Sequence, residues 1–155
     1  MKVVRTFWVI TALTQLSIAG SVQAVSPSPG GASVSIANID DGDTLPLQFN
    51  VKFSVNGMGI APAGTNIENT GHHHLLVDVV EMPPMNLPLP ATDNIIHFGK
   101  GQTETTLTLP AGQHTLQLLF ADYTHTPHDP PVMSERITIT VAADAPAQAE
   151  KKKDS

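Results

Sequence analysis

Two groups of histidines stand out as residues that could bind a metal ion. Three consecutive histidines occupy positions 72–74 in the segment GHHHLLVDV, and His125 and His128 occur in the segment YTHTPHDPP. Neutral imidazole is a common ligand of Cu(II), Zn(II) and Ni(II). The chain contains no Cys, so thiolate metal sites and cysteine nucleophiles are excluded, and histidine would be the main ligand of any transition metal.

The triplet runs into an apolar segment that is typical of a β-strand. Successive side chains of a strand point to opposite faces, so His73 shares the face of Leu75 and Val77. We therefore expect His73 to be a hydrogen-bonded residue near the core that supports a site without binding the ion. His72 and His74 point to the other face, with Cα atoms about 6.5–7 Å apart, a spacing that suits two ligands of one ion.

The rest of the chain favours an all-β fold. Apolar and polar residues alternate across positions 45–55, 116–120 and 137–141, which predicts strands with one buried face. Turns rich in Gly, Pro and Asp separate these segments, and no segment shows a long helical period. The pattern predicts an immunoglobulin-like Greek-key β-sandwich of about seven strands.

The expected order of the strands brings the two histidine groups together. We assign strands to residues 32–38, 44–55, 72–80, 94–98, 103–109, 113–123 and 132–141. In this fold the connection before the third of these strands and the connection before the last lie at the same end of the sandwich. His72 and His74 should therefore meet His125 and His128, with His97 as a fifth candidate ligand.

Other polar and sulfur-containing side chains have weaker claims on the same site. Asp122, at the end of the next-to-last strand, is expected to orient a ligand histidine by accepting a hydrogen bond from its ring. His114 starts that strand and should lie at the opposite end of the sandwich. Met58, Met82 and Met85 offer thioethers, which suit Cu(I), although methionine more often simply packs.

The ends of the chain predict export. A basic start and an apolar run that ends at Ala24 are typical of a cleaved secretory signal, which we assign to residues 1–24. A flexible leader at 25–31, the β-domain at 32–141 and a disordered charged tail at 142–155 follow. We expect a soluble periplasmic or secreted bacterial protein that has no membrane span once the signal is removed.

The charge balance excludes nucleic acid as a partner. Lys and Arg total 8 against 14 Asp and Glu, for a formal net charge of −6, and two of the basic residues lie within the expected signal. A nucleic-acid-binding protein would need a basic face.

Two long segments resemble a known family. The runs GMGIAPAGTNIENTGHHHLLVDV and HFGKGQTETTLTLPAGQHTLQLLFADYTHTPHDPPVMSERITITV, within residues 57–141, are similar to the bacterial domain-of-unknown-function 4399 family. The resemblance implies an exported bacterial protein with a small β-domain. It implies no agreed activity, so the metal hypothesis depends on the spacing of the histidines alone.

These observations lead to one main functional hypothesis and two alternatives. The main hypothesis is a periplasmic protein that binds a transition-metal ion, copper first and zinc second, without catalytic turnover. The first alternative is an interaction module of the cell envelope whose histidine-bearing end binds a protein or a glycan without metal. The second, a metal-dependent enzyme, would need an open coordination position and a nearby general base.

Overall fold

The computed structural model describes residues 25–148, which form ten strands and no helix. The expected signal at residues 1–24 and the last part of the expected tail, residues 149–155, lie outside the described residues. The all-β prediction is confirmed. Within residues 25–148 no helix is long and apolar enough to cross a membrane.

The strands are β1 (Ser33–Ile36), β2 (Thr44–Leu45), β3 (Gln48–Asn56), β4 (Gly59–Ile60), β5 (Thr70–Val77), β6 (Ile95–His97), β7 (Glu104–Thr108), β8 (Gly112–Ala121), β9 (Pro127–Met133) and β10 (Ile137–Val141). Their number exceeds the expected seven for two reasons. β2 and β4 have only two residues each. The segment expected as one last strand is divided between β9 and β10.

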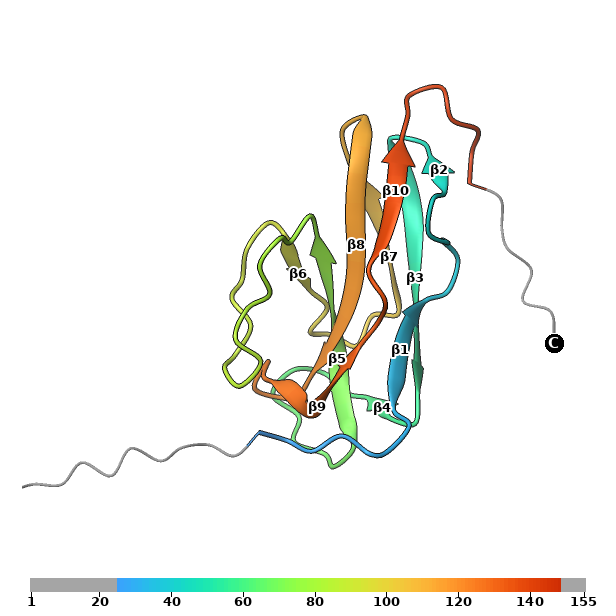
Figure 1. Cartoon of the computed structure of the whole chain (residues 1–155). Coiled ribbons are helices and arrows are strands. Elements are labelled where there is room, and N and C mark those ends of the chain that lie inside the picture. The colour runs from blue at the N-terminus through green and yellow to red at the C-terminus, as the bar shows by residue number, and fades with distance from the viewer. Residues whose placement is uncertain (1–24, 149–155) are drawn as a thin grey trace, which may run out of the picture.

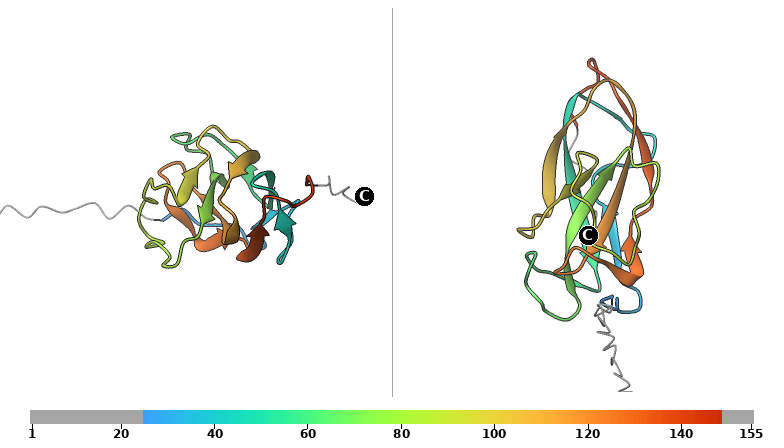
Figure 2. Two further views of the ribbon diagram at one scale, coloured as in Figure 1. Left: turned by 90° about the horizontal axis from the view of Figure 1, so that it is seen from above. Right: turned by 90° about the vertical axis from the view of Figure 1, so that its left-hand side faces the viewer.

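The strands form two sheets (Figure 1). The smaller sheet has the order β1-β3-β7, and the larger has the order β2-β10-β8-β5-β4, with β6 paired to β5 and β9 paired to β8. Figure 2 gives two further views of the same arrangement. These sheets are consistent with the immunoglobulin-like sandwich that the sequence predicts.

The main core fills the space between the two sheets. Phe49 and Val51 of β3 are buried, and so are Leu116 and Leu118 of β8. Each pair is two residues apart, so the alternation of a strand points both of its members inward. Full burial of a side chain of this size stabilises the fold by about 1.5–3 kcal/mol.

A second apolar cluster covers the outer face of the larger sheet. The connection between β5 and β6, residues 78–94, lies over that face and is visible beside β6 in Figure 1. Its Leu89 is buried against Leu119 of β8, and its Met82 and Met85 pack on the same cluster. The sulfur of Met82 also accepts a hydrogen bond from the Arg136 guanidinium, at 3.6 Å. These methionines therefore serve as packing residues, and β5 is buried on both faces.

The segment expected as a flexible leader is bonded to the β-domain. The Ser26 carbonyl accepts a hydrogen bond from the Asp129 backbone N–H at 3.0 Å, and the Ser28 N–H donates to the Asp129 carbonyl at 3.1 Å. The Ser28 hydroxyl donates to the Pro130 carbonyl at 2.7 Å. Backbone pairing therefore holds part of residues 25–31 beside β9, which composition alone did not indicate.

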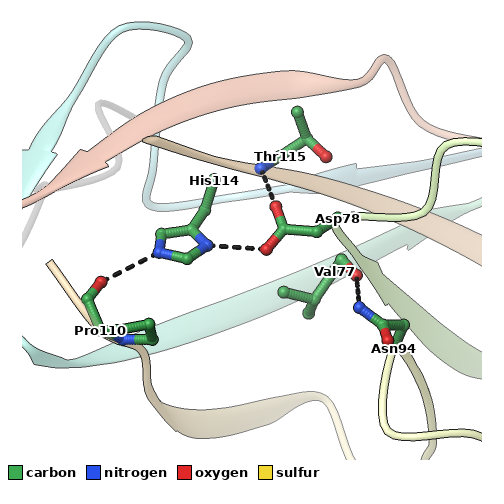
Figure 3. A network of polar contacts seen from close by, with 6 residues as sticks. All are labelled: Val77, Asp78, Asn94, Pro110, His114 and Thr115. Carbon is green, nitrogen blue, oxygen red and sulfur yellow. Dashed lines mark hydrogen bonds and ion pairs between the residues drawn. The ribbon is translucent and has the colours of Figure 1, made fainter. Parts of the chain in front are cut away.

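His114 lies in a separate polar network at the start of β8 (Figure 3). One ring nitrogen is 2.7 Å from the Asp78 carboxylate and the other is 2.9 Å from the Pro110 carbonyl. The Asp78 carboxylate also accepts the Thr115 N–H at 2.8 Å. Because both ring nitrogens face acceptors, this site favours the doubly protonated imidazolium. His114 is thus a structural residue, in line with its exclusion from the candidate ligands.

The His114 network should make stability depend on pH. Burial lowers the pKa of His114, but the hydrogen bonds to Asp78 and Pro110 and the Asp78 charge outweigh it and raise the pKa above 6.5. The stabilisation is therefore full below pH 6.5 and is lost as the pH rises through the raised value. We expect His114→Gln to lower the free energy of unfolding more at about pH 5.5 than at about pH 9.

The difference between the two pH values should be roughly 1 kcal/mol or less, because the Asp78 side chain is 40% exposed and solvent screens the pair. Urea unfolding of wild type and variant at both pH values measures it. If His114→Gln lowered the free energy of unfolding equally at both pH values, the charge of His114 would not contribute to stability.

Candidate metal centre

Four histidine rings converge on the outer face of the larger sheet. They come from three separate segments of the chain, and all six distances between their ring centroids fall between 4.6 and 6.1 Å. The members of this four-histidine cluster are His72 and His74 of β5, His97 of β6 and His125 of the turn between β8 and β9.

Strand β5 positions the two buried members. His72 and His74 are two residues apart, so both point to the outer face, and their ring centroids are 4.8 Å apart. They are 0% and 2% exposed. β5 pairs with β8 on one side, where His72 lies opposite Ala121 and His74 opposite Leu119. These two imidazoles are therefore held on a strand that pairs on both sides.

Strand pairing also brings His97 into the cluster. In the antiparallel register of β5 and β6, His97 lies directly opposite His74, and their rings stack at 5.0 Å between centroids. The His97 side chain is exposed. A Cβ atom at position 99 would lie 2.5 Å from the His97 Nε2 atom. Any residue other than glycine at position 99 would therefore collide with the imidazole ring in its present position. The alternation of apolar and polar residues gives no sign of this role for Gly99.

A tight turn presents His125. Its backbone N–H donates to the Asp122 carbonyl at 2.9 Å, and its carbonyl accepts the Leu89 N–H at 2.9 Å. Its φ of 69° lies in the left-handed region, where non-glycine residues are uncommon. The His125 ring centroid is 4.6 Å from that of His97 and 5.1 Å from that of His72.

Asp122 supports this turn through its side chain. One carboxylate oxygen accepts the Thr124 N–H at 2.8 Å, the Thr124 hydroxyl at 2.7 Å and the Thr126 N–H at 3.1 Å. The other accepts the Ser26 hydroxyl at 2.6 Å. None of these donors is an imidazole. Asp122 therefore holds the backbone that carries His125, whereas its position in the sequence predicts that it orients a ligand ring directly.

Asp122 is charged at neutral pH. Burial raises the pKa of this carboxyl, but the hydrogen bonds from Ser26, Thr124 and Thr126 outweigh burial and hold the pKa below 3.8. The carboxylate is therefore a fixed negative charge near the four-histidine cluster, close enough to His72 to favour a positive charge there.

His128 does not join the cluster, although the sequence analysis counted it as a ligand. Its ring stacks on Phe120, with 6.1 Å between centroids and 22° between planes. A Cβ atom at position 71 would lie 3.0 Å from the His128 Nε2 atom. His128 therefore lies on the face of β5 to which position 71 points, opposite the face of His72 and His74.

An irregularity between β8 and β9 separates His125 from His128. Phe120 pairs with Val132, but the next residue, Ala121, pairs with Pro127, so the register shifts between them. The bulge turns the chain so that His125 stays in the turn above the outer face while His128 enters β9 on the other face. Their spacing of three residues gave no sign of this.

His73 points into the main core. It is fully buried, between the rings of Phe53 at 5.2 Å and Phe120 at 5.0 Å. Burial lowers the pKa of His73 to about 4, and a contact with the Gln102 backbone acts in the opposite direction. That contact falls outside strict hydrogen-bond geometry, so neither ring nitrogen has a well-formed hydrogen bond within residues 25–148. His73 is therefore a core residue on the side that the alternation of β5 predicts.

The buried members of the cluster are neutral at physiological pH. Burial, reinforced by the imidazoles of His97 and His125, lowers the pKa of His72 to about 4. Burial and the neighbouring rings lower the pKa of His74 to about 3. Burial and His125 also lower the pKa of His97. Neutral imidazole, with a free lone pair, is the form that binds metal ions.

Several ring nitrogens in the cluster have no protein partner. Both nitrogens of His72 are buried and make no hydrogen bond within residues 25–148. The Nδ1 of His74 is also buried without a partner in hydrogen-bond geometry, although the His72 backbone lies close enough to raise the pKa of His74 against the effect of burial. An unsatisfied buried polar atom costs about 1–3 kcal/mol, and such atoms are rare in folded proteins without a functional reason. A metal ion would take one nitrogen from each ring and would remove that part of the cost.

The geometry is suited to a single ion. One nitrogen from each of His72, His74 and His97 lies within 4.8 Å of the others. Metal–imidazole bonds are about 2.0–2.1 Å long, so nitrogens on one ion lie roughly 3–4 Å apart, and small side-chain rotations would close the set. The nitrogens of His125 lie outside this set of three. The His125 ring centroid is 4.6–6.1 Å from those of the other three rings, so the side chain would have to turn to bring a fourth nitrogen to the ion.

Comparison with known proteins places the chain in a family but supplies no relative of known activity. The family model described as a domain of unknown function, DUF4399, matches residues 51–142, which is more than half of the chain and includes all four histidines of the cluster. No curated protein and no solved structure matches significantly. The chain therefore belongs to the family of the domain of unknown function DUF4399.

Proposed function

We propose that this protein binds one transition-metal ion, copper first and zinc second, through the four-histidine cluster. The observation that carries the proposal is the convergence of four imidazoles from three chain segments, two of them buried with unpartnered nitrogens. The expected signal sequence and the family resemblance support a bacterial periplasmic or secreted location. The role is binding, buffering or delivery of the ion, without turnover.

Burial of the cluster is difficult to explain as packing alone. Apolar residues would fill the same space without the cost of unsatisfied nitrogens. An anion is a poor occupant, because the chain has a formal net charge of −6 and the Asp122 carboxylate lies nearby. A cation that binds nitrogen ligands would satisfy the ring nitrogens and would also be attracted by the negative charge of the surroundings.

The donor set favours copper over zinc. All four donors are imidazole nitrogens, and the methionines of the 78–94 connection pack in an apolar cluster. Sites of this kind bind Cu(II) more tightly than Zn(II), following the general order of divalent first-row metals. The donors therefore suit Cu(II) better than Cu(I), which prefers sulfur.

The proposal predicts about one Cu(II) ion per chain. The untagged protein would be stripped with a chelator, dialysed against limiting Cu(II), Zn(II) or Ni(II), and analysed for bound metal by mass spectrometry. An electron paramagnetic resonance spectrum of the Cu(II) form should show splitting from several nitrogens.

A folded protein that retains none of the three ions would overturn the proposal. The histidine-bearing surface would then be tested for a protein or glycan partner of the cell envelope, whose binding would survive a chelator.

A further inference from the structure

The four histidines of the cluster differ in their access to solvent. His72 and His74 are buried, His125 is half-buried, and His97 is exposed. An incoming ligand can therefore reach a bound ion from the side of His97. The strands β5 and β8 block the approach from the inner face of the larger sheet.

The four also differ in how firmly they are held. β5, which carries His72 and His74, has pairing strands on both sides. The backbone of His125 is hydrogen-bonded at both its N–H and its carbonyl. His97 is the last residue of the three-residue strand β6, which pairs only with β5 among the described strands. His97 is therefore the member most easily displaced.

An open hollow lies beside His97. It has a volume of about 520 Å³ and is lined by Ala91, Thr92, Asp93, Ile95, Ile96 and His97. A hollow of this size accommodates a small chelating molecule. Among the described residues that line it, Asp93 alone carries a charge, so the hollow suits a neutral or cationic ligand better than an anionic one.

From these differences we propose that the bound ion is exchanged by ligand substitution at His97. A nitrogen ligand enters through the hollow and forms a bond to the ion, and the bond from His97 then breaks. His72 and His74 hold the ion during this step, with the His125 ring, 5.1 Å from that of His72 between centroids, turning onto the ion as His97 leaves. No electron is transferred. The inference depends on the proposed function and assigns the cluster to passing the ion on rather than to storing it.

The test uses the Cu(II)-loaded protein and free L-histidine as the acceptor. Stopped-flow absorbance in the visible band of Cu(II) follows transfer of the ion over a range of acceptor concentrations. We expect a rate that rises linearly with L-histidine concentration, because the acceptor takes part in the limiting step. His97→Ala should increase the rate by about tenfold, because one bond no longer has to break.

Two further variants sharpen the test. Gly99→Ala keeps the imidazole of His97 but displaces it, since the added Cβ would collide with the ring, and it should also accelerate transfer. His114→Gln, in a network with no contact to the cluster, should leave the rate unchanged.

A rate that does not depend on L-histidine concentration, in protein that carries its Cu(II) ion, would overturn the exchange proposal alone. So would equal acceleration by His97→Ala and His114→Gln. Absence of bound Cu(II) before mixing would instead overturn the proposed function. If His97→Ala does not fold, two measurements still test the exchange proposal. They are the dependence of the wild-type transfer rate on L-histidine concentration and the transfer rate of Gly99→Ala.

Discussion

Replacing His72 or His74 with alanine should abolish tight Cu(II) binding, whereas replacing His73 with phenylalanine should preserve it. The three residues are adjacent in sequence, but the alternation of β5 sends the outer two to the cluster and the middle one to the main core. Loss of a group that only supports a metal ligand costs 10–100-fold in affinity. Loss of a ligand on a rigid strand should cost more than about 100-fold.

His73→Phe is the matched control for these two variants. Phenylalanine has a similar shape and would lie between Phe53 and Phe120, where it removes two buried nitrogens without hydrogen-bond partners. We therefore expect stability that is equal to or higher than that of the wild type.

Competition with a chelator of known affinity measures Cu(II) binding by these variants, and thermal unfolding monitors the fold. If His73→Phe lost the ion as completely as His74→Ala while remaining folded, the assignment of faces in β5 would be wrong.

Replacing Asp122 with alanine should have the second largest effect, on both stability and metal affinity. Asp122 is 4% exposed, and its carboxylate accepts four hydrogen bonds. Its removal leaves the N–H groups of Thr124 and Thr126 without this acceptor, which should lower the free energy of unfolding by about 2–4 kcal/mol. The turn that carries His125 would loosen, and Cu(II) affinity should fall about tenfold or more.

Two controls separate the local effect of Asp122 from a general loss of stability. Asp122→Asn keeps an oxygen that can accept the backbone N–H groups of the turn, so it should be milder in both respects. Leu107→Ala, in β7 of the other sheet, removes a buried side chain of the main core and should lower stability without weakening Cu(II) binding.

Urea unfolding and chelator competition on the three proteins provide the comparison. A destabilised Asp122→Ala protein that binds Cu(II) as tightly as the wild type would show that Asp122 does not position His125.

The alternation of apolar and polar residues was sufficient to predict much of the fold and half of the cluster. It identified the strands that contain Phe49 and Leu116, and it placed His72 and His74 on one face and His73 on the other. Alternation is a local property, set by the backbone of a single strand, so one sequence is enough to read it.

The partners of those two histidines depended on contacts between distant segments. His97 belongs to the cluster because the register of β5 and β6 places it opposite His74. His125 lies in the turn before β9 and belongs to the cluster, whereas His128 lies within β9, beyond the register shift between Phe120 and Ala121, and does not.

The sequence by itself therefore determined that this is a β-protein with two histidines paired on one strand face. Only the tertiary structure decided which other histidines join them, that Asp122 acts through the turn, and that the 78–94 connection covers the outer face of the larger sheet. Each of these features depends on how strands pair and pack across long separations in sequence. Such pairing is selected by the packing of the whole domain, so no short segment specifies it.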